Sequence, residues 1–180
     1  MKLSTVMDRF VLHWGEMGAR WGVNRSVAQI HALLFLADKP MAADEVVETL
    51  GIARSNVSTS LRELISWRLV HLVHIHGDRR DHFEAEKDCW TVFQRIVEGR
   101  KQREIDPTLS TLRSCMIDSA EDNETPASAR TQLAELHDFL ETLDHWYDEM
   151  RRLEPPTQRR LLRMGGAIVK VLPGGRQAKE

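Results

Sequence analysis

Two short stretches with helical spacing of apolar residues meet across a glycine, and this pair limits the possible folds more than any other feature. The first stretch covers residues 42–50, and the second, with one apolar stripe, covers residues 54–67. Gly51 stands where a helix that ends abruptly needs a left-handed residue. Two helices joined so tightly predict a helix-turn-helix, whose second helix lies in the major groove of DNA.

The polar face of the stretch 54–67 has the chemistry of a groove-binding helix. Short hydroxyl and amide side chains let the backbone approach the duplex, and an arginine can pair with two acceptors of one guanine. The alternative is an ordinary solvated helix whose serines cap its N-terminus. We predict DNA contacts from Arg54, Ser55, Asn56, Ser58, Thr59 and Arg62.

A histidine-rich stretch follows this helix, and its pattern predicts a β-hairpin over residues 70–87. The segment HLVHIH alternates apolar and polar residues, GDRR supplies turn residues, and DHFEAE can return as the second strand. A helix-turn-helix followed directly by a hairpin is a winged helix, whose hairpin tip reaches the minor groove or the phosphates beside it.

Two arginines, Arg79 and Arg80, stand at the predicted hairpin tip between Asp78 and Asp81. The arginines are the predicted DNA contacts of the wing. The acids are poor groove ligands themselves, so we expect one of them to hold an arginine in place through a charge-assisted hydrogen bond.

The histidines of the hairpin allow a second interpretation, a metal-sensing regulator. His74 and His76 are two apart on a strand and share a face, while His82 lies across the turn, so three imidazoles could converge. No cysteine is nearby, and alternate histidines of a strand commonly face phosphate or water on an exposed wing. We therefore favour structural or DNA-facing histidines, and predict no metal or other cofactor.

Residues 41–86 resemble the winged-helix core of the MarR superfamily, and within it the GbsR-like branch. The resemblance rests on the Gly51 turn, the SNVSTSLREL helix, the WRLV segment that leads into the wing, and a GDRR tip similar to the Asp-x-Arg wing motif of that family. It implies a dimeric, ligand-responsive transcriptional regulator, in the simplest case a repressor. Such a protein binds a roughly palindromic stretch of double-stranded DNA with two recognition helices and two wings.

Amphipathic stretches flank this core and predict a mainly α-helical fold with a small β wing. Helices are expected over residues 4–18 and 24–38, with Asn24 as an N-cap, and they complete a DNA-binding domain over residues 1–87. The remainder, residues 88–180, is predicted to be a helical dimerisation region, because its apolar faces need partners that a thin winged-helix core cannot supply.

Within that region the first helix is expected to bend or restart at Pro107, with Asp106 as the cap of the new segment. A helix over about 126–153 and an amphipathic stretch over 157–172 with Ile168 and Val171 follow. The residues of the long helix expected to point inward are Leu133, Leu136, Leu140, Leu143 and Tyr147. A monomer with one enlarged core and a purely helical interaction protein without DNA binding remain the alternatives.

The composition, together with the lack of known enzyme motifs, excludes several classes of function. Two cysteines, Cys89 and Cys115, and no recognisable leader predict a reduced, cytoplasmic protein, and no apolar run is long enough for a membrane span. The net charge of −2 is unusual for a phosphate binder, although basic residues concentrate after Arg151. No phosphate loop, zinc-protease motif or nucleophile elbow is present, so we predict that the chain is not an enzyme.

A small-molecule effector is a weaker expectation, since it depends on four tryptophans, Trp14, Trp21, Trp90 and Trp146. Aromatic boxes can bind quaternary ammonium ligands through cation–π contacts. Tryptophans at helical spacing are more often core residues, so the sequence predicts no particular ligand or pocket.

Overall fold

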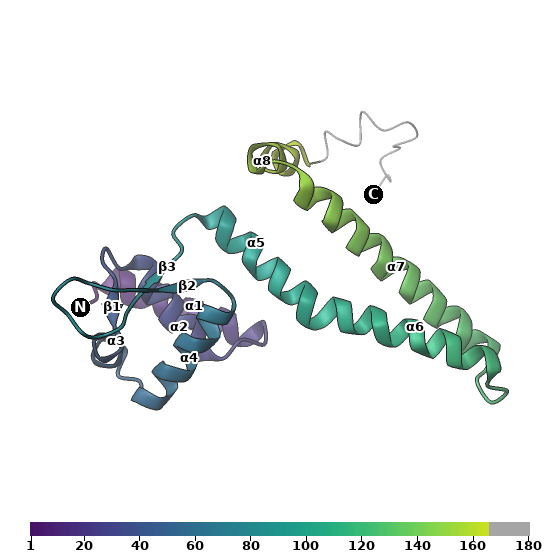
Figure 1. Ribbon diagram of the computed structural model, residues 1–180, viewed down its shortest axis with the longest axis horizontal. Helices are drawn as coiled ribbons and strands as arrows, with labels where there is room; N and C mark the ends of the chain where they lie inside the picture. The colour runs from purple at the N-terminus through teal and green to yellow at the C-terminus, as the bar shows by residue number, and fades with distance from the viewer. Residues whose placement is uncertain (166–180) are drawn as a thin grey trace. The chain divides into compact units, whose positions relative to one another are not determined.

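The computed structural model describes residues 1–165, and the chain divides into two compact units, Met1–Gly99 and Arg100–Glu180. The end of the predicted stretch 157–172, including Ile168 and Val171, lies outside the described residues. The elements of the first unit, labelled in Figure 1, are α1 (Thr5–Arg20), α2 (Arg25–Leu36), β1 (Met41–Ala42), α3 (Ala43–Leu50), α4 (Arg54–Ser66), β2 (Val70–Val73), β3 (His82–Ala85) and α5 (Cys89–Arg100).

The first unit has the predicted winged helix-turn-helix architecture. Gly51 adopts the left-handed conformation (φ 64°, ψ 26°) between α3 and α4, and the side chain of Asn24 caps α2 by accepting a hydrogen bond from the Ser26 N–H at 2.8 Å. The sheet is antiparallel with the order β1-β3-β2. The predicted fold class, mainly α with a small β wing, is confirmed. Strand β1 was not predicted, because two residues carry no periodic pattern.

The core of this unit forms around α2, which is buried on almost every side. Ile30 and Leu33 are fully buried and belong to one cluster with Val57 of α4 and Val46 of α3. A Cβ atom on Gly18 would lie 2.5 Å from the Cβ of Ala28, so α1 approaches α2 as closely as its backbone allows. This packing fixes the orientation of α4 relative to the supporting helices, and leaves its polar face in solvent.

The end of α2 is tied to the segment after the wing by a lysine. Lys87 Nζ donates hydrogen bonds to the carbonyl oxygens of Leu34, Phe35 and Ala37 at 2.7–2.8 Å, and it lies 5.9 Å from the ring centre of Phe35. Helix C-terminal carbonyls otherwise lack intrahelical donors, and a cation at this end also interacts favourably with the helix dipole. Lys87 therefore joins the wing to the core helix.

We expect Lys87→Met to lower the free energy of unfolding by about 1–2 kcal/mol, because the carbonyls lose a charged donor while the aliphatic stem is kept. Urea denaturation of the full chain measures the change. Lys39→Met is the matched control, since Lys39 is an exposed lysine in the loop just after α2. Equal stabilities of the two variants would contradict the role given to Lys87.

The second unit begins with a π-helical turn, η1 (Lys101–Ile105), and continues as α6 (Asp106–Glu121), α7 (Ala127–Arg152) and α8 (Pro155–Met164). Helices α6 and α7 pack against each other, as Figure 1 shows. Lys101 joins them, because its Nζ lies 2.7 Å from carboxylate oxygens of both Asp106 and Asp144, and these partners hold its pKa above the usual range despite burial. No described helix combines the length and the apolar character that a membrane span requires.

Two local details of this unit differ from the expectation. A new α-helix, α6, starts at Asp106 with Pro107 in its first turn, as expected, but Asp106 is a helical residue paired with Lys101 and not the N-cap. The wider π-helical winding just before the proline relieves the clash of its ring with the preceding turn. Leu136 and Leu143, expected to point inward, are exposed in this single chain, whereas Leu133, Leu140 and Tyr147 are half-buried.

Candidate nucleic-acid interface

The six residues predicted to contact DNA on the second helix of the helix-turn-helix all lie on the exposed face of α4. Val57, Leu61 and Leu64 point into the core from the opposite face. Since α4 has only one acid, Glu63, this face offers hydroxyl, amide and guanidinium groups to a partner. The exposed residues are Arg54, Ser55, Asn56, Ser58, Thr59 and Arg62.

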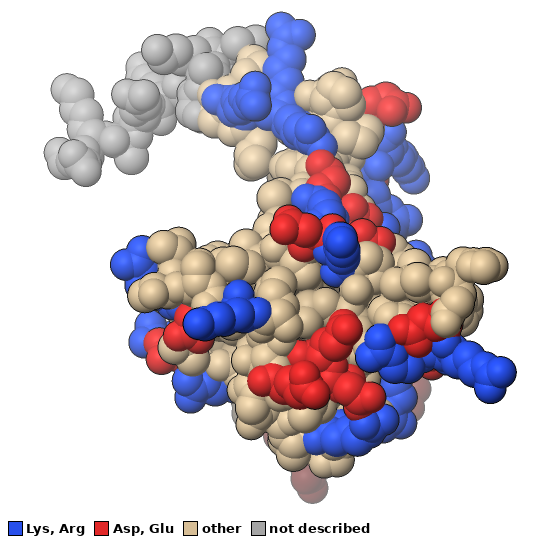
Figure 2. Space-filling model, turned by 90° about the vertical axis from the view of Figure 1, so that its left-hand side faces the viewer, with Lys and Arg blue, Asp and Glu red and all other residues tan. Residues whose placement is uncertain are grey.

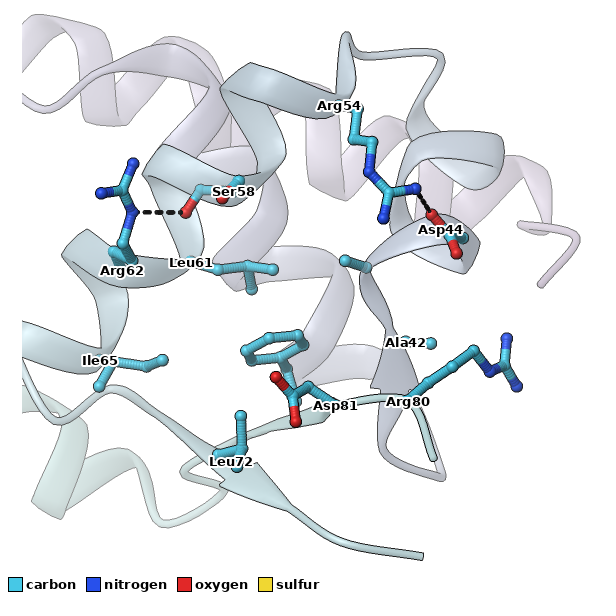
Figure 3. A pocket seen from close by; sticks show the side chains of 12 residues that line it. Ala42, Asp44, Arg54, Ser58, Leu61, Arg62, Ile65, Leu72, Arg80 and Asp81 are labelled. Carbon is cyan, nitrogen blue, oxygen red and sulfur yellow. Dashed lines mark hydrogen bonds and ion pairs between the residues drawn. The ribbon is translucent and has the colours of Figure 1, made fainter. Parts of the chain in front are cut away.

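The two arginines of α4 have local acceptors. Arg54 donates to the carboxylate of Asp44 in the first turn of α3, and Figure 3 shows the two side chains pointing toward each other. Arg62 donates to the Ser58 carbonyl at 3.4 Å and to Thr59 Oγ1 at 3.3 Å. Both guanidinium groups are exposed, so phosphates or bases can replace these acceptors.

The wing differs from the predicted hairpin in the length of its strands. Strands β2 and β3 pair over residues 70–73 and 82–85, and residues 74–81 form the connecting loop. His74 and His76 therefore lie in the loop rather than on a strand, and both are exposed. The prediction that they share one strand face was wrong, because the turn begins earlier than the alternating pattern indicates.

Asp78 holds Arg80 at the wing tip, as expected for one of the flanking acids. Its carboxylate accepts hydrogen bonds from the Arg80 backbone N–H at 2.9 Å, from Nε at 3.0 and 3.1 Å, and from Nη2 at 2.6 Å. These bonds hold the pKa of Asp78 well below its usual range. Arg80 Nη2 also lies 3.9 Å from a carboxylate oxygen of Glu45. Arg79 is exposed and forms no ion pair within residues 1–165.

His82 is buried, unlike the two histidines of the loop. It lies on the central strand β3, paired with Ala42 and Val73, and only 3% of its surface is exposed. Its Nδ1 is 2.9 Å from the Arg80 carbonyl oxygen, and its Nε2 is 3.4 Å from Asp78 Oδ2.

The three histidines considered as metal ligands do not form a cluster in the described part of the chain. Within that part, the only group of three potential ligands whose ligand atoms lie close together is on α7, where His137, Asp138 and Glu141 meet. The tryptophans considered for an effector site are also separate. Trp14 contacts Phe10, Trp90 contacts Phe93, and Trp21 is exposed, while Trp146 belongs to the second unit.

A hollow of about 460 Å³ lies between α4 and the wing (Figure 3). Its floor is apolar, formed by Leu61, Ile65, Leu72 and Phe83, and charged side chains surround it. Arg54 and Arg62 reach it from α4, and Arg80 and Asp81 from the wing. Three of the six predicted contact residues of α4, Arg54, Ser58 and Arg62, therefore border one concave surface with one of the two wing arginines.

Sequence reasoning missed two residues that organise this surface, namely Asp44 and Glu45. Asp44 binds Arg54, and Glu45 accepts a hydrogen bond from the Ala42 N–H at 2.9 Å while it approaches Arg80. On the face that Figure 2 shows, acidic side chains gather beside basic ones. The local positive charge is thus partly neutralised within the chain, in keeping with its small net charge.

Comparison with known proteins agrees with this architecture. The model of the MarR family matches residues 18–81. YvaV of Bacillus subtilis (strain 168), whose name assigns it to the HTH-type transcriptional regulators, is 26% identical over 86 residues, which are 48% of this chain and 49% of that protein. The match therefore spans about half the length of this relative.

A second relative and a solved structure extend over more of the chain. The HTH-type transcriptional repressor OpcR of the same organism is 24% identical over 143 residues, 74% of each protein. A crystal structure of a transcriptional regulator has the same fold with a TM-score of 0.64 at 16% identity, and covers 79% of this chain and 93% of that one. Residues 18–81 of this chain therefore match the MarR family model, and they fold as a winged helix-turn-helix.

Proposed function

We propose that this protein is a transcriptional regulator that recognises a specific duplex sequence through α4 and the wing. The observation that carries the proposal is the shared concave surface, which is lined by exposed Ser and Arg side chains of α4 and by a wing arginine that Asp78 holds in place. An α-helix with this side-chain chemistry fits the major groove, and a wing arginine fits the adjacent minor groove.

We further propose that the regulator acts as a homodimer, with two copies of this surface. Helix α7 exposes apolar side chains at Leu136, Phe139, Leu143 and Trp146, a spacing that places them on one side of the helix. An apolar stripe of this kind on a surface helix is typical of an interface. A two-fold dimer would present two recognition helices to successive major grooves.

We also propose that this regulator represses transcription, that it responds to a ligand, and that it belongs to the GbsR-like branch. The name of OpcR, a transcriptional repressor, supports repression. The resemblance of the wing and recognition helix to GbsR-like proteins supports the other two features. The structure offers no preferred effector site among the described tryptophans, so no ligand is assigned.

Selection of bound duplexes from a random pool tests the proposal directly. We expect an enriched motif with two-fold symmetry, because each half-site is read by one copy of α4. Enrichment without a common motif would contradict sequence recognition, and a motif without symmetry would contradict the dimer.

Asn56→Ala should change the base preference at one position of each half-site. An asparagine can bond two edge groups of an adenine, and such a pair discriminates against other bases by about 1–3 kcal/mol. Repeating the selection with the variant measures the change. Asn123→Ala, at an exposed loop position of the second unit, is the control that should keep the original motif. A uniform loss of affinity without altered preference would demote Asn56 to a phosphate contact.

A further inference from the structure

The ring of His82, the first residue of β3, lies next to two oxygen atoms of the wing loop. Nδ1 lies 2.9 Å from the carbonyl oxygen of Arg80, and Nε2 lies 3.4 Å from Oδ2 of Asp78. The same Asp78 carboxylate accepts the Arg80 guanidinium. His82 thereby contacts both ends of the pair that positions the wing arginine.

A neutral imidazole cannot satisfy both acceptors, since it carries only one N–H. With the proton on Nδ1, the lone pair of Nε2 faces a carboxylate. With the proton on Nε2, the lone pair of Nδ1 faces a carbonyl oxygen at 2.9 Å. A doubly protonated ring donates to the Arg80 carbonyl and carries its second N–H on Nε2, 3.4 Å from the Asp78 carboxylate, so this geometry favours the imidazolium form.

We propose that His82 is a positioning residue for Arg80, and that its protonated ring closes the wing loop in the conformation that binds DNA. The inference rests on the proposed function and deepens it, because it makes DNA affinity dependent on a proton taken up inside the protein. When His82 loses that proton, Asp78 loses one of its two cationic partners, and the loop that carries Arg80 loosens.

The charged groups that contact His82 or its partners come from the wing loop and from α3, and Asp81 precedes His82 in the chain. The wing loop contributes Asp78 and Arg80, and α3 contributes Glu45, which lies 3.9 Å from Arg80 Nη2. Strand β1 contributes Met41 and Ala42, which do not titrate. The remaining titratable pair of the sheet, His71 and Glu84, joins β2 to β3 at a distance of 3.3 Å and is largely solvent-accessible.

The test is the pH dependence of binding to the selected duplex at constant salt. Wild-type affinity should fall about three- to tenfold as the pH rises from 5.5 to 8, because loss of the ring proton removes a cationic partner of Asp78. His82→Asn can still donate to the Arg80 carbonyl but cannot titrate, so its affinity should change much less with pH. His76→Asn, at an exposed histidine of the wing loop, should keep the wild-type dependence. Equal pH profiles for wild type and His82→Asn would overturn the proposal.

Two further measurements keep the test decisive. If His82→Asn does not fold, Asp78→Asn removes the carboxylate that faces Nε2 at an accessible position, and it should also flatten the pH profile; an unchanged profile argues against the inference.

Nitrogen NMR of the wild-type imidazole without DNA should show both ring nitrogens protonated at pH 5.5, whereas a single neutral tautomer would overturn the assignment. Absence of DNA binding at every pH would instead refute the proposed function, because the NMR result does not depend on DNA.

Discussion

Arg80→Ala is expected to weaken binding to the selected duplex by about tenfold or more at physiological salt. Arg80 is already oriented by four hydrogen bonds to Asp78, so little conformational freedom remains to be lost when it meets the DNA. The slope of log affinity against log salt concentration should also decrease by about one if the lost contact is a phosphate. Titrations at several salt concentrations measure both quantities.

The neighbouring arginine is the matched control for this variant. Arg79→Ala removes the same charge from the same loop, but Arg79 forms no ion pair with the described residues that would orient it. We therefore expect a smaller loss of affinity from Arg79→Ala. If the two variants lose affinity equally, general charge rather than the Asp78–Arg80 pair explains wing binding. If neither loses affinity, the wing has no role.

The parts of the fold that could be predicted are those encoded by neighbouring residues. The Asn24 cap, the Gly51 turn and the single apolar stripe of α4 are local signals, and each appears in the structure as expected. The positions of the exposed residues on α4 follow from the same stripe, since residues off the buried face must meet solvent or a partner.

The features that could not be predicted depend on residues distant in sequence. Strand β1 exists only because Met41 and Ala42 pair with Phe83 and His82, about forty positions later. Arg54 donates a hydrogen bond to Asp44 only because the turn of the helix-turn-helix brings the starts of α3 and α4 together. The burial of His82 follows from its place on the central strand, which an alternating pattern alone does not reveal.

The second unit illustrates a different limit. The periodicity of α7 indicates an apolar stripe, but it does not show which of the apolar residues the chain itself covers. Leu136 and Leu143 remain exposed in one copy of the chain, so the pattern describes a face whose partner is absent from a single chain. The proposed dimer supplies such a partner, and the symmetry of the selected DNA motif is its test.

His31 should make the protein lose stability as the pH falls below neutrality. It lies on α2 with 5% of its surface exposed, beside the rings of Trp14 and Phe35, and its buried Nε2 has no hydrogen-bond partner among the described residues. Burial, aided by the charge of Lys87, lowers the pKa of His31 to about 4. The folded protein therefore keeps this ring neutral where the unfolded chain binds a proton.

The sign of the effect follows from proton uptake. Above about pH 6.5 the ring is neutral in both states and contributes no pH dependence. Between about pH 6.5 and 4 only the unfolded state takes up the proton, so the free energy of unfolding falls with decreasing pH, by about 3 kcal/mol in total from this one group. Urea denaturation at a series of pH values measures the decrease.

The comparison of two histidine variants isolates this contribution from that of the carboxylates. His31→Leu fills the same apolar site without a titrating group, so its stability should decline less than that of the wild type, with the difference developing below pH 6.5. His13→Leu, at an exposed position of α1, should decline as the wild type does. If His31→Leu and wild type lose stability in parallel, His31 is protonated in the folded state, and its neutral burial in the aromatic cluster is wrong.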